Sequence, residues 1–301
     1  LLNLIFLEKV DRFNEFIAFD YLKRQCEFGP RFPGSDGHKK CQNYFESFLR
    51  DKVDTLYIFK HTIKNPYSED SLRLTNFFGR FNPNNKERLL LLAHWDTRPY
   101  ADLDPNPINR NSPIIGANDG ASGVAVLMEI VNFLNQLDLE FIGVDILFVD
   151  GEDYALAGDG FNFGLGTKLF SKNIPDPRPR YAIGVDMVGD KDQAFKVEKF
   201  SYMQAPELVE DVWKVAHNLG YDQFLEIMGP AIIDDHKVLY DHSGIPSIDI
   251  IDFDYPNEYK NYWHTLDDTI DKCSPSSLDA VGETLIEYLM QYNNRFNNEQ
   301  H

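Results

Sequence analysis

The stretch that decides the fold is Arg88-Leu89-Leu90-Leu91-Leu92-Ala93, followed directly by His94-Trp95-Asp96. An uninterrupted apolar run of this length is typical of a parallel strand that is buried on both faces. Polar side chains that follow such a strand lie beyond its carboxyl end, where open α/β sheets bind their ligands. This stretch therefore predicts a central strand and, next to it, a candidate site.

The same pattern recurs along the chain, with amphipathic segments between the apolar runs. Further buried strands are predicted at Val144–Val149, Tyr181–Asp186 and Ser247–Ile251, and an antiparallel edge pair at Thr55–Ile63 and Leu72–Phe78. Helices are predicted at Arg12–Glu27, His38–Asp51, Ala121–Leu137, Thr167–Ser171, Pro206–Leu219 and Ser276–Tyr292. Strands that alternate with helices imply an α/β fold, a three-layer sandwich with a central, mostly parallel, twisted sheet.

Composition narrows the possible partners. No internal repeat or linker divides the 301 residues, so 1–301 is expected to form a single domain. The net charge of −19 disfavours nucleic acid and anionic membranes as partners, and no apolar run of about 18 residues predicts a membrane-spanning segment. The three cysteines lack the spacing of a zinc site, and whether Cys26 and Cys41 form a disulfide is left open.

Ionisable side chains gather at the predicted strand ends. Each one alone would be an ordinary cap or turn residue, but their joint occurrence at one edge of the sheet predicts a functional site. Neighbouring carboxylates repel each other unless a cation neutralises them, and a mixture of imidazole and carboxylate favours zinc. The candidates are Asp119, in a turn before a helix, and the strand-end residues His94, Asp96, Glu152, Asp153, Asp186 and His264.

Other segments are expected to be less specialised. Pro99–Pro113 contains four prolines between two site segments and is predicted to be a stiff loop over the pocket. His38 follows a Gly-Ser-Asp-Gly loop and is expected to be an ordinary residue. We expect structural or surface roles for the histidines away from the strand ends, which are His61, His217 and His242.

In order along the chain, five motifs resemble those of the M28 metallopeptidases: HWDT at 94–97, GANDGASG at 116–123, DGED at 150–153, DMVG at 186–189 and HTLDD at 264–268. The resemblance runs from about Gly29 to the last helix and implies a zinc-aminopeptidase fold of the phosphorylase/hydrolase type. The family contains di-zinc aminopeptidases, which remove N-terminal residues, and single-zinc glutaminyl-peptide cyclotransferases. The latter convert N-terminal glutamine to pyroglutamate and release ammonia.

The resemblance implies a role for each residue of the shared zinc site. Asp119, Asp153 and His264 would bind the zinc, and Glu152 would transfer the proton. Animal cyclases carry a Glu-Glu pair where this chain has Glu152-Asp153, so an exchange of roles between these two residues stays open.

The remaining candidates differ in role between the two branches. In an aminopeptidase, His94 and Asp186 would bind a second zinc, with Asp96 orienting His94. In a cyclase only one zinc would be bound, and Asp186, hydrogen-bonded to Asp234, would position the substrate amine.

Two features favour the cyclase branch over the aminopeptidase. Asp234-Asp235-His236 resembles the cyclase Asp-Asp-His, where aminopeptidases commonly have Ser-Asp-His. Trp263 immediately precedes His264, as in cyclases, where the ring lines the substrate pocket. A non-catalytic binding domain on the same scaffold is a third interpretation, which the intact set of ligands and base disfavours.

One departure concerns the substrate pocket. Animal cyclases have a pocket tryptophan near the position of Gly158, so that wall would come from Phe161, Phe163 or Trp95. The resemblance implies peptide or protein N-termini bearing glutamine as substrates, and bacterial relatives are exported to the periplasm or cell envelope. The oligomeric state is not indicated.

Overall fold

The computed structural model describes residues 13–137 and 139–298, which are built around one six-stranded sheet. In chain order its strands are β1 (Thr55–Lys64), β2 (Ser71–Phe81), β3 (Arg88–His94), β4 (Gly143–Val149), β5 (Tyr181–Asp186) and β8 (Ser247–Ile251). Their spatial order is β1-β2-β4-β3-β5-β8, with β4, β3, β5 and β8 parallel. β2 is antiparallel to both β1 and β4. The predicted parallel sheet and its antiparallel edge pair are confirmed.

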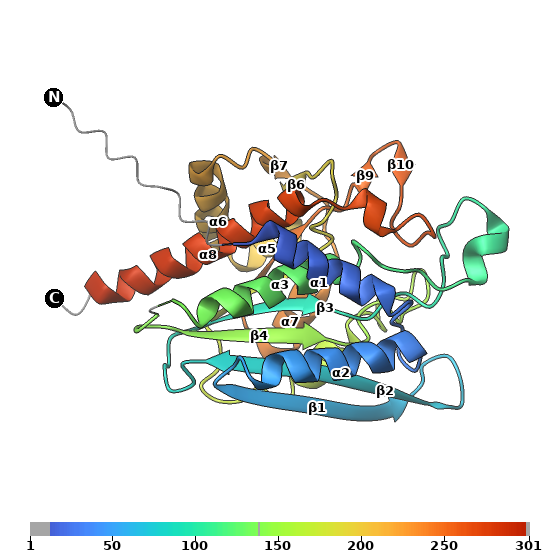
Figure 1. Cartoon of the computed structure of the whole chain (residues 1–301), viewed down its shortest axis with the longest axis horizontal. Coiled ribbons are helices and arrows are strands. Elements are labelled where there is room, and N and C mark those ends of the chain that lie inside the picture. Colours follow the sequence, from blue (N-terminus) through green and yellow to red (C-terminus); the bar gives the residue numbers. More distant parts are fainter. Residues whose placement is uncertain (1–12, 138, 299–301) are drawn as a thin grey trace.

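Helices cover both faces of the sheet, because alternate residues of the central strands belong to opposite cores. On β3, Leu89 and Leu91 join one apolar cluster, whereas Leu90 and Leu92 join the other. Figure 1 shows α1, α2 and α3 on the near face. The helices are α1 (Glu15–Glu27), α2 (Asp36–Arg50), α3 (Ala121–Leu134), α4 (Leu165–Phe170), α5 (Lys199–Gln204), α6 (Pro206–Leu219), α7 (Asp235–Ser243) and α8 (Pro275–Asn298).

Several short elements were not predicted from the sequence. They are α5, α7, the parallel pair β6 (Phe195–Val197) and β7 (Phe224–Met228), the small hairpin β9 (Pro256–Asn257) and β10 (Lys260–Asn261), and the 3₁₀ turns η1 (Pro107–Asn111) and η2 (Ile270–Lys272). These segments are too short for periodicity to reveal them. α7 begins after Asp234, whose buried carboxylate caps the helix, so Asp234 is a buried cap residue and not part of a solvated turn.

Helix boundaries near the N-terminus shift for a local reason. The predicted start at Arg12 lies outside the described residues, and α1 begins at Glu15 because Asn14 caps the N–H groups of Phe16 and Ile17. α2 begins at Asp36, since Ser35 accepts a hydrogen bond from the N–H of His38. His38 therefore lies inside the first turn of α2 and not in a loop.

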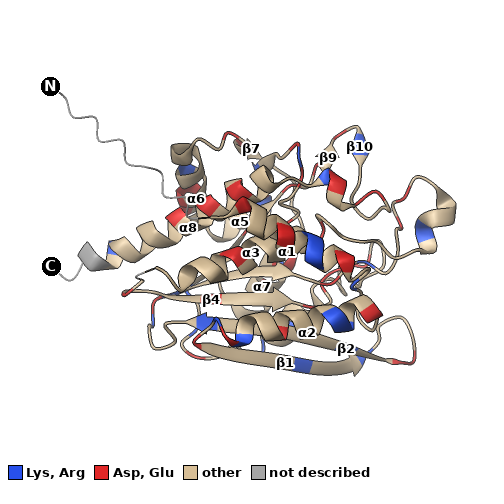
Figure 2. Cartoon of the chain, in the orientation of Figure 1, with Lys and Arg blue, Asp and Glu red and all other residues tan. Residues whose placement is uncertain are grey.

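The cysteines and the surface charge complete the description. Cys26, Cys41 and Cys273 are buried free thiols, so the question of a disulfide between Cys26 and Cys41 is answered negatively. Acidic residues are distributed over many elements, including α1, α3 and α6 (Figure 2). Within the described ranges, no helix is both long enough and apolar enough to cross a membrane.

Candidate metal centre and active site

The carboxyl ends of the parallel strands bring the predicted site residues together. His94 is the last residue of β3, Asp186 is the last residue of β5, and the loop after β4 carries Glu152 and Asp153. Asp119 enters from the turn before α3, where Gly120 has φ +95°. A Cβ atom on Gly120 would lie 2.5 Å from the carbonyl oxygen of Asp96, so the turn approaches β3 this closely because that position is glycine.

Asp119, Asp153 and His264 form a buried triad that fits a metal ion. His264 Nε2 lies 3.2 Å from Asp153 Oδ1 and 3.6 Å from Asp119 Oδ2. Four-coordinate zinc places its ligand atoms roughly 3.3 Å apart. Oδ2 of Asp119 and Oδ2 of Asp153 are buried without a hydrogen-bond partner among the described residues. Buried carboxylate oxygens without donors are costly unless a cation compensates them, so the triad matches the donor set of zinc.

A second group of potential ligands shares Asp119 with this triad. His94 Nε2 lies 3.3 Å from Asp119 Oδ1 and 3.1 Å from Asp186 Oδ1, and the ligand atoms of these three residues lie within 4.8 Å of one another. Asp119 could therefore bridge two ions, so the geometry accommodates either one or two.

Asp96 supports this arrangement from behind. Its carboxylate is fully buried, lies 3.7 Å from His94 Nδ1, and accepts the N–H groups of Glu152 and Asp153 at 3.0 and 3.3 Å. The expected contact with His94 is therefore present, and the hydrogen bonds to the loop after β4 were not predicted from the sequence. Asp96 ties the end of β3 to the loop that carries Glu152.

The electrostatics of Glu152 suit an exchangeable proton. Burial raises the pKa of Glu152 well above its usual range; His94 opposes this rise, and the nearby Asp234 and Asp153 reinforce it. Its Oε2 lies 4.0 Å from His94 Nδ1. By contrast, burial would raise the pKa of Asp153, but the charges of His264 and Arg98 outweigh it and lower that pKa to about 2. Of the two neighbouring acids, Asp153 is thus the one held ionised.

Asp186 and Asp234 are close to each other, but the expected hydrogen bond between them is not found among the described residues. Asp186 Oδ1 faces His94 Nε2 and the N–H of Met187, and Asp234 accepts the N–H of Asp235. Asp186 is thus directed at His94 and at its own segment, and Asp234 at the start of α7. Burial, followed by the nearby Asp249, raises the pKa of Asp234 to about 7, and burial also raises that of Asp186, with Asp234 contributing.

Trp263 lies beside the triad, as expected. Its half-buried ring is 3.8 Å from the ring of His264 and 4.9 Å from that of Phe253. His264 has φ +57° and Met187 has φ +46°, the left-handed region that residues other than glycine seldom adopt. Such backbone strain concentrates at functional sites, which supports a function for this edge of the sheet.

Arg98 is a buried residue of the site that the sequence did not reveal. Its guanidinium donates to Asp153 Oδ1 at 2.8 Å and makes a two-pronged pair with Asp102, both bonds measuring 2.8 Å. Asp102 Oδ1 in turn lies 3.6 Å from His264 Nδ1. The only sequence signal was a charged residue shortly after the strand-end histidine. Arg98 and Asp102 thus brace both Asp153 and His264 from the loop side.

The proline-containing loop Pro99–Pro113 is tied to the His264 segment. The N–H of Leu103 donates to the carbonyl of His264 at 3.2 Å, and Asp104 Oδ2 accepts the N–H of Leu266 at 3.1 Å. The loop is therefore attached to a proposed ligand. Whether it covers a bound substrate stays a prediction.

Of the three aromatic residues expected to replace the missing pocket tryptophan, Trp95 is excluded. It is fully buried and stacks on His38 at 4.4 Å, and His38 Nε2 contacts Asp150 at 2.9 Å. His38 is therefore part of the packing under the site loop. Phe163 lies over Arg98, 5.7 Å from its guanidinium carbon, whereas 83% of Phe161 is exposed. Phe163 is thus the better-placed wall residue.

A third buried cluster lies near Asp234. His236 Nε2 contacts Glu198 at 3.0 Å, and His236 Nδ1 lies 3.4 Å from Asp249. Burial would lower the pKa of His236, but the two flanking acids, Asp249 first, raise it to about 10. An imidazolium at this position would offset part of the negative charge of the flanking acids, and Asp234, His236 and Asp249 also fall within 4.8 Å of one another.

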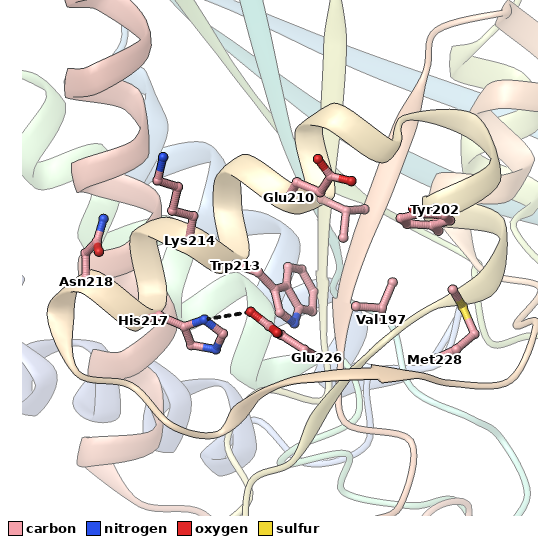
Figure 3. Close-up of a pocket in the computed structure, with 10 residues that line it drawn as sticks. Val197, Tyr202, Glu210, Trp213, Lys214, His217, Asn218, Glu226 and Met228 are labelled. Atoms are coloured by element: carbon pink, nitrogen blue, oxygen red, sulfur yellow. Dashed lines mark ion pairs between the residues drawn. The ribbon is translucent and has the colours of Figure 1, made fainter.

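A hollow of about 590 Å³ lies between α6 and β7. Figure 3 shows Trp213 projecting from α6 and lying beside Glu226 of β7; Glu226 forms an ion pair with His217, 3.5 Å long. None of the residues that line the hollow belongs to the strand-end cluster. The expectation that His217 lies away from the site is confirmed.

Comparisons with known proteins agree with this geometry. Residues 76–289 match the profile of peptidase family M28. A glutaminyl cyclase of Porphyromonas gingivalis is 38% identical, with a TM-score of 0.89 over 94% of this chain and 99% of that one. A Zn-dependent exopeptidase from Parabacteroides distasonis is 37% identical, with a TM-score of 0.86 over 92% and 98% of the two chains. The glutaminyl-peptide cyclotransferase of Bos taurus is 22% identical over 87% of this chain and 78% of its own length.

Proposed function

The chain belongs to peptidase family M28, and from that premise we propose that it is a zinc-dependent glutaminyl-peptide cyclotransferase. It converts the N-terminal glutamine of peptides or proteins to pyroglutamate and releases ammonia. The observation that carries this proposal is the near full-length likeness to a bacterial glutaminyl cyclase. The buried triad of Asp119, Asp153 and His264 supplies the donor set that the activity requires.

One zinc ion held by the triad is the proposed cofactor. When bound, it would polarise the γ-carboxamide oxygen of the glutamine as a Lewis acid. Asp153 would help to hold the ion, since Arg98 donates to its Oδ1 and its Oδ2 has no donor among the described residues. Asp119 would bind through Oδ2, and His264 through Nε2, the atoms that face one another in the triad.

Proton transfer is assigned to Glu152. The α-amine of the substrate attacks the γ-carbon, a new C–N bond closes the five-membered lactam, and the bond to the amide nitrogen breaks. Glu152 takes a proton from the attacking amine and delivers it to the departing nitrogen, which leaves as ammonia. A raised pKa suits a carboxyl group that must both accept and return a proton.

Asp186 and Asp234 are proposed to position the α-amine. Two close carboxylates resist ionising together, so one proton shared in this pair leaves a single negative charge to hold an amino group. Asp186 retains 13% exposure of its side chain, so it is the more accessible of the two. The direct hydrogen bond between them is not required for this role.

Trp263 is proposed to bind the glutamine side chain and to exclude water. Its ring lies against His264, so a glutamine packed on it would place its carboxamide next to the triad. Excluding water matters because water competes with the amine as nucleophile. Phe163 is proposed to complete the wall.

A di-zinc aminopeptidase is the second candidate function, favoured by one specific observation. His94, Asp119 and Asp186 are also close enough to hold an ion, with Asp96 behind His94. In that case Glu152 would activate a water molecule to cleave the first peptide bond. His94 already contacts both neighbouring acids, however, and an imidazolium at that position would replace a second cation.

Two dipeptides separate these candidates. Purified protein is incubated with Gln-Ala and with Leu-Ala, while ammonia and free leucine are measured and zinc per chain is determined. The cyclase is expected to release ammonia from Gln-Ala, to leave Leu-Ala intact and to hold about one zinc. Release of leucine without ammonia, with about two zinc ions per chain, would establish the aminopeptidase instead.

Three further proposals follow the family. We propose that residues 1–301 form one catalytic domain, that it acts on exported peptides or proteins with N-terminal glutamine, and that it functions in the periplasm or cell envelope. The net charge of −19 agrees with partners other than nucleic acid or anionic membranes.

A further inference from the structure

A buried carboxylate next to the triad is not used by the proposed reaction. Asp268 is fully buried, four residues after His264, and belongs to no predicted ligand or base. Its Oδ1 accepts the N–H of Asn118 at 2.8 Å and the hydroxyl of Tyr255 at 2.9 Å, and its Oδ2 accepts the N–H of Asp119 at 3.2 Å. Among the described residues, the hydrogen bonds of this carboxylate thus go to the turn that carries Asp119 and to a buried tyrosine.

The hydrogen bonds of Asp268 resemble those that Asp96 makes on the other side of the site. Asp96 accepts two consecutive N–H groups, those of Glu152 and Asp153, and Asp268 accepts the two consecutive N–H groups of Asn118 and Asp119. In each case an acid that follows a site histidine binds the backbone of another ligand-bearing segment. Asp268 therefore joins the His264 segment to the Asp119 turn, which are about 150 residues apart in the sequence.

The Asp119 side chain depends on this backbone anchor. No hydrogen-bond donor contacts Asp119 Oδ2 in the described part of the chain. Apart from the contact of Oδ1 with His94 Nε2 at 3.3 Å, the position of this carboxylate depends on its backbone. From Asp119 onward, Gly120 and the start of α3 fix the chain, while Asp268 holds the N–H groups of Asn118 and of Asp119 itself.

We infer that Asp268 is a positioning residue for the metal, acting through the backbone of Asp119. The hydroxyl of Tyr255 completes the anchor, because it binds the same oxygen that holds Asn118. Groups that orient a ligand from the second layer typically change metal affinity roughly 10–100-fold when removed. The inference rests on the proposed zinc site but not on the cyclisation reaction.

The test replaces Asp268 with asparagine and measures metal binding directly. Asp268→Asn keeps one acceptor oxygen but turns an NH₂ group toward a backbone N–H, so one anchor bond is lost. The zinc dissociation constant, from competition with a chromogenic chelator, is expected to rise roughly 10–100-fold. The visible absorption of the cobalt(II)-substituted protein is expected to change as well, since Asp119 would shift within the coordination shell.

The matched control is Asp252→Asn. Asp252 is also fully buried and also accepts two backbone N–H groups, from Ala194 at 3.0 Å and Asp254 at 3.2 Å, but it contacts no ligand-bearing segment. This variant is expected to lower the melting temperature and to leave the zinc affinity and the cobalt spectrum unchanged. A purely structural role for Asp268 would give the same pattern as this control.

Tyr255→Phe is the milder test and decides the matter if Asp268→Asn does not fold. It removes one bond to Asp268, and the zinc dissociation constant is expected to rise roughly 2–10-fold. Zinc affinities of both variants within twofold of the wild type would overturn the inference. If the wild-type protein bound no zinc, the proposed metal site itself would be wrong. If the wild-type protein bound zinc but released no ammonia from Gln-Ala, only the proposed cyclase activity would be wrong.

Discussion

Two buried clusters each place a histidine between two acids, yet they differ in how charge is balanced. In the triad of Asp119, Asp153 and His264, one oxygen of each carboxylate has no donor among the described residues. In the other cluster, Glu198 accepts the N–H groups of Phe200, Ser201 and Ile232 besides its bond to His236, and only Asp249 Oδ2 has no hydrogen-bond donor among the described residues. Proximity of ligand-type residues is common to both. The two clusters differ in degree: in the described part of the chain, both acids of the triad have an oxygen without a donor, whereas only one of the two acids beside His236 does.

The largest expected effect comes from deleting an acid in each cluster. Asp153→Ala should abolish stoichiometric zinc and lower kcat/KM by roughly 10³-fold, because a Lewis acid contributes several kcal/mol to charge stabilisation. Asp249→Ala should retain about one zinc per chain. Metal analysis after dialysis, together with ammonia release from Gln-Ala, checks both. Zinc lost from Asp249→Ala but kept in Asp153→Ala would reverse the assignment of the two clusters.

A substitution of Glu152 should affect catalysis without affecting metal binding by the triad. Glu152→Gln removes the proposed proton carrier but leaves the triad in place, so kcat should fall roughly 10²–10⁴-fold with zinc content unchanged. Steady-state assays with zinc analysis measure both quantities. If full activity persisted, the exchange of roles with Asp153 would have to be reconsidered.

The cluster around His236 should make the stability of the protein depend on pH in the acid range. Burial would raise the pKa of Glu198, but its hydrogen bond to His236 and that residue's charge outweigh burial and lower it from 4.5 to about 2. A carboxylate with a depressed pKa stabilises the fold above its ordinary pKa, and this contribution is lost as pH falls from about 4.5 toward 2. We expect a loss of about 2 kcal/mol over that interval. Urea unfolding at pH 5 and pH 3 should show this loss in the wild type and a smaller one in Glu198→Gln.

The smallest effect concerns access to the two histidines. His264 lies against the half-buried Trp263, whereas His236 is fully enclosed. Trp263→Ala should therefore lower kcat/KM for Gln-Ala roughly tenfold through lost packing on the glutamine, and Trp263→Phe should lower it less. Zinc content serves as the control and should stay constant. An unchanged kcat/KM in Trp263→Ala would remove this residue from the substrate pocket.

The sheet and the triad could be predicted because local patterns specify them. The apolar run before His94 identifies a central strand, and Asp119, Asp153 and His264 each lie within a recognisable motif. The strand-end rule then brings them together without further information. Residues of this kind are visible in a single sequence.

The residues around the triad could not be predicted, since their partners are distant in the chain. Arg98 binds an acid 55 residues away, and Asp268 binds a turn about 150 residues away. The local sequence of Arg98 does not distinguish it from a solvated charge, and the motif HTLDD that ends at Asp268 does not indicate which segment this acid binds. Trp95 shows the opposite error, because an aromatic residue beside a site histidine was a candidate pocket wall and is instead packed on His38.

The three buried cysteine thiols can be used to measure how often the folded structure opens. Burial raises the pKa of Cys26 and of Cys41 to about 12, and that of Cys273 also rises well above its ordinary value. Alkylating reagents attack the thiolate, so the native state should be almost inert toward them. The rate at which a maleimide alkylates these three thiols would then report how often the structure opens and exposes them. The ratio of the rates without and with added zinc would measure how much the ion stabilises the closed structure.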